Sequence, residues 1–268
     1  MTVILTYHSQ ILSGNEYANN DHVALAADLL LLGELGRPIV PLAALFDAFD
    51  GRRDWASLLG AVVLTFDDGA DLDWRDVEYP GLGIQPGFAG LLRGHRHTTG
   101  RPAMASSFVI ASRSAREAMD RRSLFDRGWL SDDWWREAAA GDVISIESHG
   151  FDHDHPDVNP NDPRRGNFAR VDDAAQCAAQ IDAASAEIER LSGFAPQAFA
   201  YPYGQSSAYL RQQYLPREGQ RLGLRGAVST EPGVVNSQSD RWWLPRYVCN
   251  RDWRSVDELR ALLDGRGD

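Results

Sequence analysis

The sequence predicts a single α/β domain whose mainly parallel sheet is closed, or nearly closed, into a barrel. Short apolar runs of strand length alternate with longer segments of helical periodicity, which is the pattern of consecutive β/α units. A chain of 268 residues can build one domain with a substantial core, although two small domains would also fit this length. Because neither an internal repeat nor a flexible linker divides the chain, we expect one domain over residues 1–268.

The predicted elements follow one another along the chain. Apolar runs predict strands at residues 3–7, 61–66, 103–110, 143–146, 198–201, 226–229 and 243–248. Helical patterns cover residues 22–35, 42–49, 115–119, 131–139, 172–191 and 255–263. The helix that starts at residue 172 has the clearest pattern, because Ile181, Ala184 and Ile188 share one face. Asp172 or Asp173 can cap its start.

Residues 70–102 interrupt this alternation as a long excursion between two predicted strands. The segment carries Trp74, Tyr79 and several glycines. A connection of this length in a compact domain usually has a function or its own local structure. We therefore expect a long loop insertion that overhangs the face of the barrel where the strands end.

The composition is typical of a soluble globular protein and excludes some partners. The net charge of -11 argues against nucleic acid, because phosphate binding needs clustered Lys and Arg. This charge is compatible with a neutral or cationic substrate and with a bound divalent metal. Cys177 and Cys249 are too far apart in sequence for a CxxC metal site, so we interpret them as separate structural thiols.

The N-terminus has neither the basic segment nor the long apolar core of a secretory signal. The apolar run at residues 24–35 contains Asp28, Gly33 and Glu34, and it is too short and too polar to span a bilayer. A cytoplasmic location is the default expectation, with a secreted or periplasmic location left open for a chain that lacks its leader. The sequence leaves the oligomeric state open.

Residues of the kinds found in catalytic and metal sites gather at one end of the predicted strands. In parallel β/α folds, active sites are built at the carboxyl ends of the strands. The residues that lie at such an end, just past it or late in a strand are His8, Asp67, Asp68, His149, Tyr203 and Arg246. Several residues of this kind on one face predict a functional site there.

Asp67 and Asp68 are adjacent carboxylates that follow a buried strand. Such a pair needs a compensating cation or a shared proton. Neighbouring strand residues point to opposite sides, so a turn that begins at Gly69 is needed to bring both carboxylates near one centre. The alternative interpretation is an ordinary solvated turn.

His149 and His153 also follow a predicted strand, and their spacing of four suits two ligands on one helical turn. Histidine with carboxylate favours zinc, with cobalt, nickel or manganese as alternatives, over calcium or magnesium. Glu147 or Asp152 could orient an imidazole by a hydrogen bond to the ring nitrogen that does not bind the metal. His155 could substitute for His153 as a ligand. The alternative is a solvated surface loop rich in His and Asp.

Three motifs in this order resemble those of the polysaccharide deacetylases, the carbohydrate esterases with NodB homology. They are Thr65-Phe-Asp-Asp-Gly69, His149-x-x-x-His153 and the weaker Phe199-Ala-Tyr-Pro-Tyr-Gly204. The resemblance extends from the first strand to about Val248 and implies a distorted (β/α)7 barrel. It also implies metal-dependent removal of N- or O-acetyl groups from sugars.

The resemblance assigns roles to the candidate residues. Asp67 would be the general base, and Asp68, His149 and His153 would hold the metal. The backbone N–H of Tyr203 would help to stabilise the oxyanion. These roles agree with amide hydrolysis, which needs an activated water and a polarised carbonyl.

Two departures from the family pattern concern catalytic groups. Ala200 stands where an arginine often orients the base; Arg246 either replaces this arginine in space or is a surface or interface arginine. No C-terminal histidine is present to act as general acid. Here the chain resembles the branch with an N-terminal Tyr-His motif, such as poly-β-1,6-N-acetylglucosamine deacetylases, which implies His8 as the acid. The alternative for His8 is a structural role.

Trp74, Tyr79 and Tyr201 are candidate contacts to a sugar, because aromatic faces stack on the C–H surfaces of sugar rings. For Trp74 and Tyr79, a small satellite core that holds the 70–102 segment together is an equal alternative. The expected partner is therefore a carbohydrate or a small acetylated substrate.

Three functional hypotheses follow from these residues. The first is a metal-dependent deacetylase that releases acetate from a saccharide. The second keeps the site but takes a small non-sugar amide or cyclic ureide, in line with the expected cytoplasmic location. The third is a barrel that binds carbohydrate without hydrolysis; Ala200 and the missing C-terminal histidine favour it, whereas the complete set of base and ligands opposes it.

Overall fold

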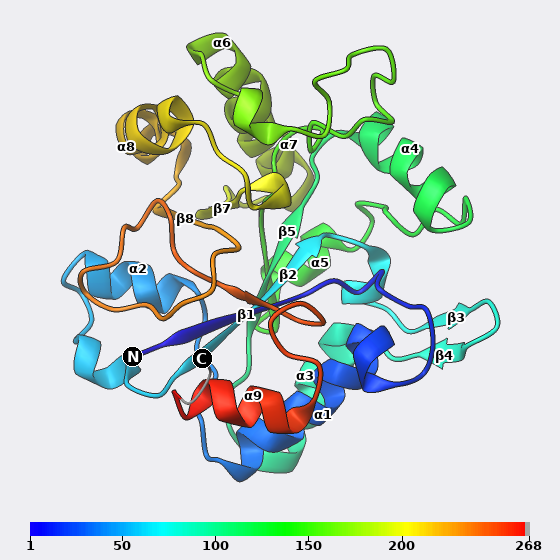
Figure 1. Cartoon of the computed structure of the whole chain (residues 1–268), viewed down its shortest axis with the longest axis vertical. Coiled ribbons are helices and arrows are strands. Elements are labelled where there is room, and N and C mark those ends of the chain that lie inside the picture. The colour runs from blue at the N-terminus through cyan, green and yellow to red at the C-terminus, as the bar shows by residue number, and fades with distance from the viewer. Residues whose placement is uncertain (266–268) are drawn as a thin grey trace.

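Seven parallel strands form one curled sheet in the computed structural model, which describes residues 1–265 (Figure 1). Their order across the sheet is β8-β7-β6-β5-β2-β1-β9, and every pairing is parallel. The strands are β1 (Val3–Tyr7), β2 (Val62–Asp68), β5 (Ala105–Val109), β6 (Ile144–Ser148), β7 (Ala198–Ala200), β8 (Gly226–Val228) and β9 (Tyr247–Val248). Each predicted strand corresponds to one of these, so the predicted single-domain (β/α)7 fold is confirmed, as a half-barrel.

The last strand segment brings the two edges of the sheet together. β9 pairs in parallel with β1, with Thr6 opposite Val248. Just before β9, Leu244 forms a parallel bridge with Val228 of β8 at the other edge. The same short segment therefore contacts both edges, and the first and last strands are neighbours as expected.

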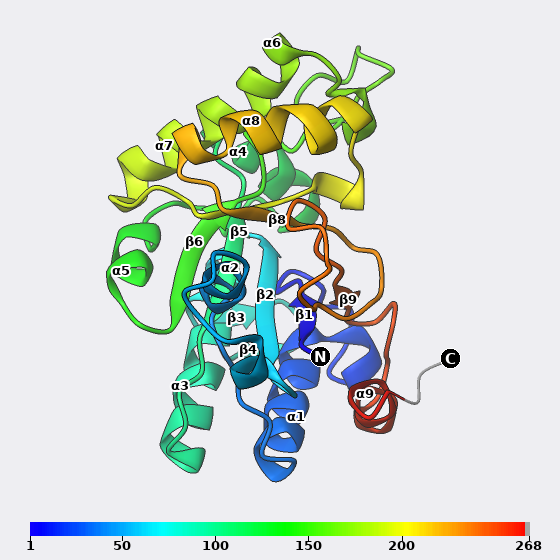
Figure 2. The same cartoon turned by 90° about the vertical axis from the view of Figure 1, so that its left-hand side faces the viewer.

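Helices cover the outer face of this sheet in two groups (Figures 1 and 2). One group packs against β1 and β2 and comprises α1 (Asp21–Glu34), α3 (Phe88–Thr99) and α9 (Val256–Leu263). The other lies in the upper part of Figure 2 and comprises α4 (Arg113–Ser123), α6 (Ala174–Cys177), α7 (Ala183–Ser192) and α8 (Leu215–Glu218). Between them, α5 (Trp135–Ala140) packs on β6 and α7. Among residues 1–265, no helix has the length and apolar character needed to cross a membrane.

The inner face of the sheet leads up to the candidate site. Side chains alternate along a strand, so Val63, Thr65 and Asp67 of β2 point inward, whereas the residues between them pack under the outer helices. α2 (Ala43–Phe49) packs on this inner side, with Phe46 in the same cluster as Val63. Asp67 is therefore the last inward residue of the strand and is itself buried, whereas Asp68 is partly exposed.

The 70–102 segment is more ordered than the long loop that we expected. A 3-10 turn at Asp71–Asp73 leads into a hairpin of β3 (Val77–Tyr79) and β4 (Gly83–Gln85), and α3 then makes the crossover to β5. The helix was not predicted because glycines lower its helical propensity and its buried stripe ends in His95. Only the hairpin part departs from a regular β/α unit.

Two further helical regions differ from the prediction. The helix predicted at 172–191 is divided by a π-helical turn at Ala178–Asp182, which separates α6 from α7. A second π-helical turn, Leu210–Tyr214, leads directly into α8, where no helix was predicted; Pro216 lies in the first turn of α8. Short 3-10 turns complete the structure at Tyr17–Asn19, Trp55–Leu58, Phe168–Arg170, Pro202–Gly204 and Gln220–Leu222.

Gly69 follows the two aspartates in a conformation that other residues adopt only with strain. Its φ is +70°, and an added Cβ would lie 2.6 Å from Cγ1 of Val109 and 2.9 Å from its Cα. We expect Gly69→Ala to lower the free energy of unfolding by roughly 2–4 kcal/mol, from the left-handed backbone and the overpacking together. Urea unfolding monitored by tryptophan fluorescence would measure this loss.

Gly81, at the tip of the β3–β4 hairpin, is a matched control. Its φ is +78°, and no atom lies within 4 Å of an added Cβ. Gly81→Ala should therefore cost only the backbone strain, about 1–2 kcal/mol. Equal losses in the two variants would show that the contact with Val109 contributes nothing.

Candidate functional site

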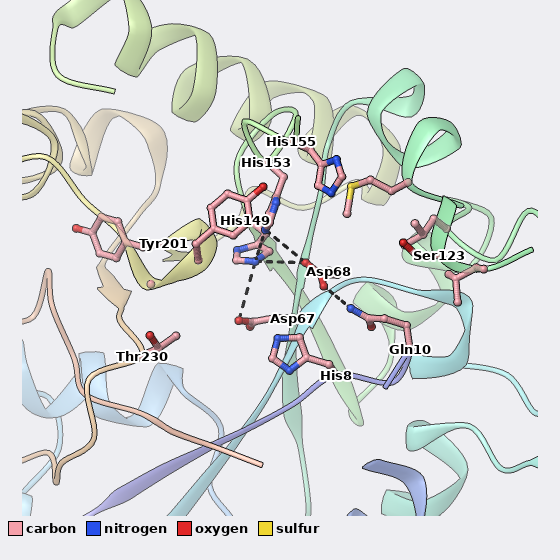
Figure 3. A pocket seen from close by; sticks show the side chains of 15 residues that line it. His8, Gln10, Asp67, Asp68, Ser123, His149, His153, His155, Tyr201 and Thr230 are labelled. Carbon is pink, nitrogen blue, oxygen red and sulfur yellow. Dashed lines mark hydrogen bonds and ion pairs between the residues drawn. The ribbon is translucent and has the colours of Figure 1, made fainter. Parts of the chain in front are cut away.

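A pocket of about 310 Å³ opens at the carboxyl ends of the strands (Figure 3). Of the predicted site residues, it is lined by His8, Asp67, Asp68, His149, His153, Tyr201 and Tyr203. They come from the ends of β1, β2, β6 and β7. The predicted gathering of these residues on one face is therefore observed.

Asp68, His149 and His153 converge on one point in this pocket. Their ligand atoms all lie within 4.8 Å of one another. Oδ1 of Asp68 is 3.5 Å from Nε2 of each histidine, and the two Nε2 atoms are 3.2 Å apart. Nδ1 of His149 donates a hydrogen bond to the carbonyl oxygen of Ala200 at 2.9 Å, and its Nε2 faces the pocket.

This arrangement fits a divalent cation. Burial, and then the neighbouring His149, lower the pKa of His153 to about 3, so its imidazole is neutral, as a ligand must be. Two Nε2 atoms that face each other can share at most one proton, whereas a cation between them and Asp68 would satisfy all three groups. The Asp-His-His group could therefore bind a metal ion through two nitrogens and one oxygen.

The backbone around the candidate ligands is left-handed at residues other than glycine. The φ angles are 74° at Asp68, 59° at His153 and 58° at Tyr203. Such residues cost on the order of 1 kcal/mol or more each and cluster at functional sites. The turn expected at Gly69 thus begins one residue earlier, at Asp68. The expected helical turn between the histidines was wrong, because His149 to His153 form a loop.

Arg246 lies inside the barrel, fully buried, directly beneath Asp67. Its Nη1 and Nη2 each donate to one carboxylate oxygen of Asp67 at 2.8 Å, and its Nε donates to the carbonyl oxygen of Ser229 at 2.7 Å. Burial alone would raise the pKa of Asp67, but the charges of Arg246 and His149 outweigh it and hold this pKa well below the usual range. The interpretation of Arg246 as a surface residue is excluded.

His8 and Gln10 form the side of the pocket that follows β1. His8 lies next to Asp67 in Figure 3, and its backbone N–H donates to Oδ2 of Asp21 at 2.7 Å. Gln10 donates through Nε2 to Oδ2 of Asp68, a contact that we did not predict. Gln10 lies in a turn after β1, in which the backbone N–H of Ile11 donates to the carbonyl oxygen of His8 at 2.9 Å, and nothing in the local sequence marks it as a site residue.

Tyr201 and Tyr203 occupy different environments in the pocket wall. The Tyr201 side chain is buried, and its hydroxyl donates to the carbonyl oxygen of Trp242 at 2.7 Å. Tyr203 is 41% exposed, and its ring packs on that of His153 with 4.5 Å between centroids. Thr230 also lines the pocket and was missed, because nothing in the local sequence distinguishes it.

Trp74 and Tyr79 do not line the pocket, so their predicted role in sugar binding is not supported. Trp74 stacks on Trp134 with 6.3 Å between centroids. Tyr79 is buried against Trp129, with 5.7 Å between centroids. These contacts match the alternative, a small core that holds the 70–102 segment in place.

Glu147 and Asp152 do not orient an imidazole either. Glu147 accepts hydrogen bonds from the backbone N–H groups of Gln197 and Ala198 at 2.7 and 2.9 Å, and thus joins β6 to the start of β7. Asp152 is bound by Gln180 and Arg165. The group that orients His149 is a backbone carbonyl, which side-chain motifs cannot reveal.

The family model for polysaccharide deacetylases matches residues 59–215, more than half of the chain. The chain therefore belongs to the polysaccharide deacetylase family, and this membership supports deacetylase activity. The comparison with curated proteins finds no significant match. The resemblance to the branch with an N-terminal Tyr-His motif stays a prediction.

Solved structures of deacetylases share the fold at low sequence identity. The Streptococcus pyogenes deacetylase PplD, in complex with acetate, is 18% identical over 98% of this chain and 97% of that chain, with a TM-score of 0.64. IcaB from Ammonifex degensii is 18% identical over 98% and 96%, with a TM-score of 0.62. A de-N-acetylase from Aggregatibacter actinomycetemcomitans is 15% identical over 97% and 99%, with a TM-score of 0.64. At these identities the likeness shows the fold alone.

Arg246→Met should lower the free energy of unfolding by roughly 3–5 kcal/mol near pH 7, because it leaves Asp67 buried and charged without its partner. In the wild type, the contribution of this pair is present above the ordinary Asp pKa of about 4 and is lost only as pH falls through the depressed pKa of Asp67. Without the arginine, the buried carboxyl takes up a proton at a higher pH. The wild type and Arg246→Met should therefore differ less in their free energy of unfolding at pH 5 than at pH 7.5, as measured by urea unfolding.

Arg52→Met is a suitable control, because Arg52 is exposed and pairs with Asp50 at 2.7 Å on the surface. Its loss should cost no more than about 1 kcal/mol. Comparable losses for Arg246→Met and Arg52→Met would contradict a special role for the buried pair.

Proposed function

We propose that this protein is a metal-dependent deacetylase that hydrolyses N-acetyl, or O-acetyl, groups of a saccharide and releases acetate. One observation carries the proposal. Asp67, held in its charged form by Arg246, lies beside the Asp68, His149 and His153 group in the same pocket. Membership of the polysaccharide deacetylase family supports the reaction class.

Asp68, His149 and His153 would hold the metal, for which we propose zinc; cobalt, nickel or manganese are the alternatives. Two imidazole nitrogens with one carboxylate oxygen support this choice. Bound there, the ion would polarise the acetyl carbonyl and acidify a water molecule. The hydrogen bond to the carbonyl of Ala200 keeps His149 in the tautomer that this binding needs.

Asp67 would accept the proton of the attacking water. Both of its oxygens accept from Arg246, so the carboxylate is fixed in orientation as well as in charge. A carboxylate with so low a pKa is a weak base for free water, and we therefore expect Asp67 to act only when the ion is bound.

His8 would donate a proton to the leaving amine or hydroxyl, because it lies across from the candidate ligands and next to Asp67 (Figure 3). The backbone N–H of Tyr203 would donate to the oxyanion that forms from the acetyl carbonyl. Of the three aromatic residues proposed to contact the sugar, Tyr201 is the one that lines the pocket.

Acetate release from a panel of substrates tests the proposed function. Acetylated mono- and oligosaccharides should release acetate, and a chelator should abolish this activity until zinc is added back. Asp68→Ala should lose both the metal and the activity, whereas Asp67→Asn should keep the metal and lose about 10²–10⁴-fold in rate. Metal content is measured by elemental analysis of the same samples.

The panel also includes small cyclic amides. Turnover of these compounds without acetate release from any saccharide would overturn the proposed substrate class. Loss of the metal from Asp67→Asn would show that Asp67 is a ligand, and the assignment of the base would then be wrong.

His8→Gln tests the proposed acid. An acid must carry its proton to act, so wild-type activity should decline at alkaline pH. In His8→Gln the rate should be lower by about 10²-fold or more, and this alkaline decline should be absent from the profile of kcat/KM against pH. A variant with the wild-type rate across the pH range would exclude His8 as the acid.

A further inference from the structure

We propose that a partly buried ionic brace behind the loop of His149 to His153 positions His153 for metal binding. The brace consists of Asp152, Asp154, Arg165, Arg170 and Gln180. This inference rests on the metal of the proposed function. It concerns side chains that touch neither the pocket nor the substrate, and whose role is to hold a ligand in place.

His153 needs support that His149 does not. The ring of His149 is oriented by its hydrogen bond to Ala200. Among residues 1–265, no protein group hydrogen-bonds to Nδ1 of His153, although this atom is buried. A histidine ligand usually has such a partner for its second nitrogen. Apart from the packing of its ring against Tyr203, the placement of His153 therefore depends on its backbone.

That backbone adopts an uncommon conformation. His153 and the next residue, Asp154, have φ angles of 59° and 49°. Two successive left-handed residues other than glycine persist only where the surroundings hold them. Both neighbours of His153 carry buried carboxylates, and the contacts of these carboxylates supply the necessary restraint.

Asp152 closes a turn around His153. Its Oδ1 accepts from the backbone N–H of Asp154 at 2.9 Å, so the bond spans the histidine. The same oxygen accepts from Nε2 of Gln180 at 2.5 Å. Oε1 of Gln180 in turn accepts from the backbone N–H of Phe151 at 3.2 Å. The Gln180 side chain thus holds both the turn at Asp152 and the residue that precedes this turn, Phe151.

Asp154 is fully buried and binds two arginines. Nη1 of Arg165 lies 2.8 Å from Oδ2 of Asp152 and 3.0 Å from Oδ1 of Asp154, so one guanidinium joins both neighbours of His153. Arg170 donates to the two oxygens of Asp154 through Nη2 and Nε, at 2.5 and 2.9 Å. Nη1 of Arg170 also lies 3.4 Å from Oδ2 of Asp162, so the two guanidiniums together contact three carboxylates. Paired hydrogen bonds of the kind between Arg170 and Asp154 are directional.

The π-helical turn at Ala178–Asp182 presents Gln180 to this loop. Such turns are rare and occur frequently at functional sites, because the extra residue redirects the side chains of the helix. Asp182, in the same turn, binds Arg221 and Tyr214 instead, at 2.7 and 2.6 Å. The π-helical turn therefore has one side chain in the brace, Gln180, and one in a separate ion pair, Asp182. Asp182 thus serves as a matched control.

Affinity of the metal-free protein for zinc tests the brace. The variants are Asp154→Asn and Gln180→Met, each close in size to the original residue, with Asp182→Asn as control. We expect a 10- to 100-fold weaker zinc affinity in the first two and less than a twofold change in the control. Competition with a chromophoric chelator measures the affinity, and thermal unfolding of the metal-free proteins reports stability separately.

A cobalt spectrum distinguishes positioning from a general loss of stability. With cobalt bound, Asp154→Asn and Gln180→Met should show altered d–d absorption bands, whereas Asp182→Asn should show the wild-type bands. Should Asp154→Asn fail to fold, Gln180→Met carries the test, because it removes no charge. Wild-type affinity and bands in variants that are merely less stable would overturn the brace and leave the proposed function intact. A wild-type protein that binds no metal would overturn both.

Discussion

The ion pair between Arg246 and Asp67 joins the closure of the fold to the charge of the site. Arg246 lies on the segment that bridges both edges of the sheet, and its guanidinium also binds Thr65 of β2 and the carbonyl of Ser229 after β8. A buried carboxylate stays ionised only with such a partner. The segment that contacts both edges of the sheet therefore also carries the cation that keeps Asp67 negative.

The fold was largely predictable because its signals are local. Apolar runs between helical stripes gave every strand of the main sheet, and their parallel arrangement followed from the helices between them. The prediction failed where local signals conflict with the tertiary structure. α3 carries two interior glycines and a buried histidine, and α8 begins with a proline-containing turn. The packing of these helices against the sheet outweighs their low propensity, and a single sequence does not display that packing.

Some residues of the candidate site could likewise be predicted from the sequence, and others could not. The predictable residues were those whose type and position at strand ends together indicate a site. They are Asp67, Asp68, His149 and His153. Arg246 remained undecided, since its partner is 179 positions away and the intervening sequence says nothing about the distance between them. Gln10 and the brace residues were missed for the same reason. Trp74 and Tyr79 show the opposite error, because an aromatic ring suits a sugar and a small core equally well.

The separation of Asp67 and Arg246 along the chain has a consequence for biosynthesis. The ribosome adds residues in order, so Asp67 is made 179 residues before its partner. Until the last segment emerges, the nascent chain has neither its closing strand nor the cation that offsets the Asp67 charge. The ion pair on the inner face therefore forms only after most of the sheet has been made. Termination just before Arg246 would leave Asp67 buried without the cation that offsets its charge, however complete the rest of the sheet.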